Sequence, residues 1–190
     1  YRPGRFLRAS DLAENLGQDD NPEWKTIAFD ELSSDLVSPQ GSIGYRWGGS
    51  GKWNIENREG GEGRETQLQL SLIDGEANAA SVAFPNFANE EHDHWQHQEG
   101  ESVLFRNVPN RTIQLSDGTE ARVATVYDLM MASYSIDRGL GGENVAGSFD
   151  DESVPNTPAW QEKITGVSRD KVITVAREFA DTADKTHGKS

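Results

Sequence analysis

Cysteine is missing from this chain of 190 residues. Its absence excludes disulfides, thiolate nucleophiles, cysteine zinc sites and iron–sulfur ligation, so any such cluster has to lie outside residues 1–190. Long apolar runs are missing too, because none approaches the roughly 20 residues that a membrane-spanning helix needs. No signal peptide precedes the first expected helix, and the two methionines, Met130 and Met131, lie far from the start.

Basic residues are scarce, with 18 Lys and Arg against 32 Asp and Glu and a formal net charge of -14. This balance argues against nucleic-acid binding, which needs basic clusters that displace counterions from phosphates. It also argues against direct docking on an anionic membrane surface. The acidity indicates solubility and is compatible with a salt-adapted source, but it favours no acidic substrate.

Apolar residues are also fewer than usual, at 34% of the chain with a mean hydropathy of -0.72. The length allows one core, or one and a half, and the composition is typical of a peripheral segment whose neighbours supply part of the core. The chain opens on Tyr1 and stops soon after a strongly patterned helix. We therefore expect an internal segment of a larger enzyme.

The first two-thirds of the chain is predicted to be rich in β-structure. A short helix is expected over Ala9–Leu16, with Gly17 as its stop. Short alternating runs follow, and Asp117-Gly118 predicts a hairpin turn between the last two. Two polar stretches, residues 48–64 and 86–100, are expected to be exposed loops. The alternating runs are Lys25–Phe29, Ile43–Trp47, Gln67–Leu72 (the clearest), Val103–Val108, Thr112–Leu115 and Ala121–Thr125.

The last third is predicted to be helical. Thr125-x-x-Asp128 resembles a capping box at the start of a helix. After a loop over Gly139–Asp151, Thr157-Pro158 predicts the start of a second helix that stops at Gly166. Ser168 is expected to cap the last helix. Its apolar stripe needs a partner surface and consists of Val172, Val175, Ala176, Phe179, Ala180 and Ala183.

We therefore predict a mixed α+β segment in two parts. Residues 1–125 form a short helix and then a β-rich segment with long polar loops, and residues 126–190 form a helical segment.

The most suggestive group of side chains is His92, His94 and His97, with Glu90, Glu91, Asp93 and Glu99 beside them. Imidazoles and carboxylates are suitable ligands for zinc, copper or non-haem iron. These histidines lie in a polar loop without a rigid base, and histidine-rich tracts are only a compositional signal. We therefore expect no metal site there.

Other motifs also assign no site. Gly48–Lys52 fails the phosphate-loop spacing, and Gly139–Gly147 lacks a dinucleotide fingerprint. No G-x-S-x-G elbow is present. The five tryptophans could line a sugar-binding face but are more typical of packing: Trp24, Trp47, Trp53, Trp95 and Trp160.

Two stretches carry a distinctive order of motifs. The first, Thr112–Leu129, has a strand, an Asp-Gly turn, a second strand and a Thr-Val-aromatic-Asp helix start. The second reads Thr-Pro-Ala-Trp from Thr157, Ile-Thr-Gly-Val from Ile164 and Ala-Arg-Glu-Phe-Ala from Ala176. In this order the two stretches resemble the molybdopterin oxidoreductase family. Further segments are similar, in the same order, to the alpha (catalytic) subunits of membrane-bound respiratory nitrate reductases: Gly4–Leu12, Asn21–Thr26, Gly41–Trp47, Gly51–Asn54 and Ala183–Gly188.

The resemblance covers nearly the whole chain and is weakest over residues 86–100. It implies a parent enzyme that reduces nitrate to nitrite at a molybdenum held by two molybdopterin guanine dinucleotides. It also implies electrons from quinol, delivered through a haem-containing membrane gamma subunit and an iron–sulfur beta subunit to one [4Fe-4S] cluster. Bacterial relatives lie on the cytoplasmic face of the membrane, and those of haloarchaea lie on its outer face.

No position in residues 1–190 matches the family's cluster ligands or its molybdenum aspartate. We therefore carry over no catalytic, cofactor-binding or metal-ligating residue and expect this segment to be scaffold. A pterin-contacting loop is expected after Ser190, which would bring residues 185–190 near the cofactor. Two alternatives stay open: a related selenate or chlorate reductase, and a free-standing β-rich binding module.

Overall fold

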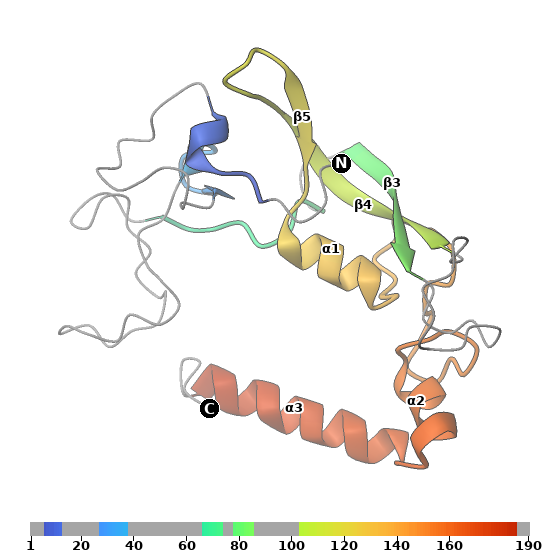
Figure 1. Cartoon of the computed structure of the whole chain (residues 1–190). Helices are drawn as coiled ribbons and strands as arrows, with labels where there is room; N and C mark the ends of the chain where they lie inside the picture. The colour runs from blue at the N-terminus through green and yellow to red at the C-terminus, as the bar shows by residue number, and fades with distance from the viewer. Residues whose placement is uncertain (1–5, 13–26, 38–65, 74–77, 86–102, 186–190) are drawn as a thin grey trace.

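The computed structural model describes residues 6–12, 27–37, 66–73, 78–85 and 103–185. These ranges form two small antiparallel sheets, a 3-10 turn and the helices α1, α2 and α3 (Figure 1). The predicted mixed α+β class is confirmed. The predicted run at 43–47, both polar loops, His92, His94, His97 and all the tryptophans except Trp160 lie outside the described residues.

The larger sheet has the order β3-β4-β5, with β3 at Asn78–Pro85, β4 at Val103–Gln114 and β5 at Glu120–Val123. The two runs predicted over residues 103–108 and 112–115 are one continuous strand. Pairing of β4 with β3 ends at Asn110, and pairing with β5 begins at Arg111. Pro109, which lacks a backbone donor, lies next to this change of neighbour, where a strand tolerates it.

The hairpin turn between β4 and β5 is confirmed. Gly118 has a φ of 80°, and its N–H donates to the Leu115 carbonyl at 3.0 Å. The Leu115 N–H donates to the Thr119 carbonyl at 2.8 Å, and Asp117 Oδ1 accepts from the Thr119 N–H at 2.9 Å. Glycine is needed in this turn because its positive φ carries no Cβ penalty.

The predicted helices are found as α1 (Val126–Ser133), α2 (Pro158–Thr165) and α3 (Arg169–Lys185). Thr157 Oγ1 accepts from the Trp160 N–H at 3.0 Å, and Gly166 ends α2 with a φ of 71°. Beside the sheet, α1 completes a small core (Figure 1). This core contains buried Phe84, Val108 and Ala132, packed with Val82, Ala124 and Leu129.

The helix predicted over residues 9–16 is wrong in its described part. A 3-10 turn covers Ala9–Asp11, and Leu12 is already extended. The Asp11 carboxylate accepts from the Arg8 N–H at 2.8 Å, and its carbonyl accepts from the Ser116 N–H at 2.8 Å. The Asp11 carbonyl is therefore bonded to the β4–β5 turn and does not serve an α-helical ladder.

The strand predicted over residues 67–72 is also wrong, because only one bridge forms there, between Leu68 and Asp30. The buried Asp30 carboxylate accepts from the Gln67 N–H at 2.7 Å, and the Gln69 N–H donates to the Phe29 carbonyl at 2.9 Å. The segment lies beside the small sheet of β1 (Ala28–Phe29) and β2 (Leu36–Val37). The Asp30 side chain and a few backbone bonds to residues 29–31 take the place of a regular strand ladder.

Strand β3 was not predicted. Three alanines contribute to its sequence, and alanine is depleted in strands. Its place depends on pairing with β4 along its whole length. Among the helices of the described ranges, none has both the length and the apolar character needed to cross a membrane.

Candidate functional site

A buried polar group is centred on Asp128, in the first turn of α1. Thr125 Oγ1 accepts from the Asp128 N–H at 3.0 Å, as the capping signal predicted. The Asp128 carboxylate is buried and accepts from the Leu72 N–H at 2.9 Å and from Ser71 Oγ at 2.7 Å. It therefore joins α1 to a segment more than fifty residues earlier in the chain.

Arg138 completes this group. Its Nη1 donates to Asp128 Oδ1 at 2.6 Å, its Nη2 donates to Ser71 Oγ, and its guanidinium lies 5.5 Å from the centre of the Tyr127 ring. Burial raises the pKa of Asp128, but the hydrogen bonds from Leu72, Arg138, Ser71 and Thr125 outweigh it, so the pKa is lowered. The carboxylate is therefore ionised at neutral pH and fully engaged.

Arg106, on β4, is a buried cation. It donates from Nη1 to the carbonyls of Ala132 at 2.8 Å and Ser133 at 3.1 Å, which are among the last of α1. Its Nε donates to the Glu143 carbonyl at 3.0 Å. Burial lowers the pKa of Arg106, and the charge of Glu143 acts in the opposite direction. A guanidinium stays protonated in proteins, so a positive charge satisfies the carbonyl end of α1.

The loop after α1 packs on the edge of β4. The Glu143 N–H donates to the Phe105 carbonyl at 2.8 Å, and the Asn107 N–H donates to the Gly141 carbonyl at 3.2 Å. Between them, Gly142 has a φ of 136°, and a Cβ there would lie 2.7 Å from the Arg106 Cα. Only glycine allows so close an approach.

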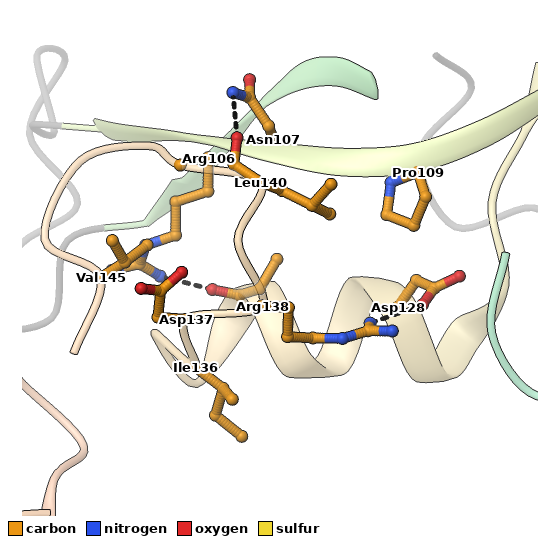
Figure 2. A pocket seen from close by; sticks show the side chains of 11 residues that line it. Arg106, Asn107, Pro109, Asp128, Ile136, Asp137, Arg138, Leu140 and Val145 are labelled. Atoms are coloured by element: carbon orange, nitrogen blue, oxygen red, sulfur yellow. Dashed lines mark hydrogen bonds and ion pairs between the residues drawn. The ribbon is translucent and has the colours of Figure 1, made fainter. Parts of the chain in front are cut away.

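A small pocket opens between β4, α1 and this loop. Figure 2 shows Arg138 reaching along α1 to Asp128, and the Asn107 amide bonded to the Leu140 carbonyl on the opposite wall. The charged groups that line it are bonded to protein atoms. This arrangement stabilises structure, and it offers no unpartnered acid or base for proton transfer.

The sequence indicated Thr125 and Asp128 only as a helix cap, and Ser71, Arg106 and Arg138 were not predicted as members of a site. The lone Arg106 within the apolar run 103–108 is the signal that could have indicated a buried cation. Within the described ranges, no three His, Cys, Asp or Glu side chains gather as metal ligands would. Asp128, Arg138 and Arg106 instead form a structural tie, a set of bonds that holds α1 to residues 66–73, to β4 and to the following loop.

No family model matches the chain. Over all 190 residues, the chain is 53% identical to the respiratory nitrate reductase 1 alpha chain and 49% identical to the respiratory nitrate reductase 2 alpha chain, both of Escherichia coli (strain K12). It is 38% identical over 190 residues to the nitrate reductase alpha chain of Bacillus subtilis (strain 168). These matches cover the whole of this chain but only 15%, 15% and 14% of the relatives, respectively.

Proposed function

The chain belongs to the family of the nitrate reductase alpha chains over the segment that it spans, and we propose that it is scaffold in a nitrate-reducing catalytic subunit. One observation carries the proposal, the 53% identity that extends over all 190 residues. The parent protein would reduce nitrate with two electrons and two protons to nitrite and water.

The scaffold role is supported by how the polar side chains are used. Asp128 and Arg106 are each bonded to several protein groups and hold α1 to the 66–73 segment, to β4 and to the following loop. We also propose the two-part division at residues 125 and 126, since α1 begins at Val126. No residue of the described ranges is proposed to act on nitrate.

The parent subunit is proposed to hold a molybdenum centre with two molybdopterin guanine dinucleotides and one [4Fe-4S] cluster. The described residues do not fit either group, because the chain has no cysteine and these ranges hold no gathered donor set. By the family resemblance, we propose that the ligands of both groups lie outside residues 1–190. We propose, by resemblance alone, that residues 185–190 approach the pterin.

The proposed partners are an iron–sulfur beta subunit and a haem-containing membrane gamma subunit, with quinol as electron donor. With these partners, the parent complex is proposed to lie on the cytoplasmic face of the membrane, or on its outer face in a haloarchaeal source. The segment's acidity is compatible with either face.

A direct assay tests the proposed activity. The whole protein, given nitrate and a reduced viologen dye, is expected to form one nitrite for every two dye electrons consumed. Protein from cells grown with tungstate in place of molybdate is the control, because dye-driven background reduction would remain there. Reduction of selenate or chlorate without reduction of nitrate would contradict the proposal in favour of a related oxidoreductase.

A further inference from the structure

One face of α3 is apolar and exposed. Val175 is 63% exposed and Phe179 is 65% exposed, and no residue of the helix is buried. We call this face the α3 stripe; it consists of Val172, Val175, Ala176, Phe179, Ala180 and Ala183. The opposite face carries polar and charged residues such as Thr174, Arg177, Asp181 and Lys185. A helix with this pattern normally buries its apolar face against another element.

The described contacts hold α3 at its beginning. Arg169 forms ion pairs with Glu162 of α2, with Asp150 at 3.1 Å and with Glu152 at 3.2 Å. The helix continues for four more turns past these pairs, and Figure 1 shows no labelled element packed along them. Charged groups therefore hold the beginning of the helix, where Val172 is half-buried, whereas the stripe residues from Val175 to Ala180 are exposed.

Exposed apolar side chains outnumber buried ones across the described residues. Fifteen large hydrophobic side chains are exposed there, whereas eight hydrophobic residues are buried and three of these are alanines. Exposing apolar surface to water costs free energy in proportion to the exposed area. These ranges therefore leave much of their apolar surface to be covered by something else.

We propose that the α3 stripe is an internal docking surface, covered in the whole protein by an apolar face of the same polypeptide from outside residues 1–190. The inference rests on the proposed function, because it is the alpha-chain family that supplies further polypeptide. The chain spans about 15% of the length of its relatives from Escherichia coli. The small side chains of Ala176, Ala180 and Ala183 leave room for close approach by an uncharged helix or sheet.

A second copy of the chain fits this surface poorly. The whole chain has a net charge of -14, so two copies of it repel one another as they approach. A segment of the same polypeptide, by contrast, always has the same sequence, so its apolar residues can be complementary to the stripe.

Photo-crosslinking in the intact complex identifies the occupant. A benzophenone amino acid replaces Phe179 in the stripe or Thr174 on the polar face, and the joined peptides are identified by mass spectrometry. Mixed heavy- and light-isotope protein separates links within one chain from links between copies. The expected result is a link from position 179 to alpha-chain residues outside 1–190, within one copy, and little or none from position 174.

Links from position 179 to another subunit, to a second copy or to residues 1–190, or no link at all, would overturn the inference. Two smaller substitutions, Ala176→Cys and Thr174→Cys, test the same surface without the bulk of the benzophenone side chain. The first cysteine is expected to react with a maleimide about tenfold more slowly than the second in the folded complex. Equal rates in urea confirm that folding is the cause, whereas equal rates in the folded complex overturn the inference.

Nitrite formation measured on the same preparations separates this inference from the proposed function. The expected link without nitrate reduction would overturn the function and leave the docking surface supported. Nitrate reduction with no such link would overturn the docking surface alone.

Discussion

The carboxylate of Asp128 and the guanidinium of Arg138 lie 2.6 Å apart, with the Asp128 side chain fully buried and that of Arg138 16% exposed. Ser71 bonds to both. The pair and Ser71 therefore join residues 66–73 to the start of α1 and to the loop that follows this helix. Removing either charge leaves the other without its partner in a largely dry environment.

Replacing Asp128 by alanine is expected to cost about 3–5 kcal/mol of local stability, because Arg138 and the Leu72 N–H lose their acceptor. Hydrogen exchange of the Leu72 amide in the whole protein measures this opening free energy. Asp137→Ala is the control, since that exposed carboxylate bonds only locally, to the Gly139 N–H at 2.8 Å among the described contacts. Equal losses in both variants would contradict the assigned tie.

The same carboxylate predicts a dependence on pH. The pKa of Asp128 is lowered in the folded chain, so the folded state binds this proton more weakly than the unfolded state does. Its stabilisation is present above the unfolded value of about 3.9 and is lost as the pH falls through the lower folded value.

The opening free energy measured at the Leu72 amide should be higher in the wild-type protein than in Asp128→Asn. This difference is expected to stay constant from about pH 7 to 5. It should shrink below about pH 4. An advantage that instead grew on acidification would show that this carboxylate is not stabilised in its charged form.

Gly142→Ala is expected to destabilise the packing of the loop on β4 by about 2–4 kcal/mol. The new Cβ would meet the backbone at the Arg106 Cα, and the φ of 136° is strained for any L side chain. Exchange of the Glu143 and Asn107 amides, which bond across this contact, reports the effect. Gly147→Ala is the matched control, because a Cβ at that position meets open space. Unchanged exchange in Gly142→Ala would contradict the close approach.

Ser135→Gly is expected to stabilise the end of α1 by about 1 kcal/mol. Ser135 is fully buried with a φ of 64°, and its hydroxyl has no hydrogen-bond partner among the described residues. The N–H groups of Ser135 and Ile136 bond back to Ala132 and Met131, which is the helix end that favours glycine. Slower exchange of the Ile136 amide is the expected readout. Ser133→Gly, at the last residue of α1, should have the opposite effect.

Local signals in the sequence predicted the elements that short-range chemistry determines. The Asp117-Gly118 turn, the Thr125 and Thr157 caps and the Gly166 stop are all found in the structure. Alternation over residues 67–72 was misleading, because the Asp30 side chain and the Phe29 backbone provide partners that no local pattern shows. Strand β3 depends on its neighbour β4 and not on its own weak propensity.

The polar tie could not be predicted in the same way. Thr125-x-x-Asp128 correctly indicated a helix start, but the carboxylate bonds to Ser71 and Arg138, which lie 57 and 10 residues away. Such partners are selected by the tertiary fold. The absence of cysteine, by contrast, follows from composition directly and excludes cysteine ligation within residues 1–190.

As proposed scaffold of a nitrate reductase, this segment should be interchangeable with the matching segment of a relative. The most direct test grafts residues 1–190 into the respiratory nitrate reductase 1 alpha chain of Escherichia coli in place of the 190 residues that they match at 53% identity. The measurement is kcat and KM for nitrate in the assembled chimera. We expect nitrite formation with an unchanged KM. A chimera that keeps its full molybdenum and iron content yet forms no nitrite would contradict the claim.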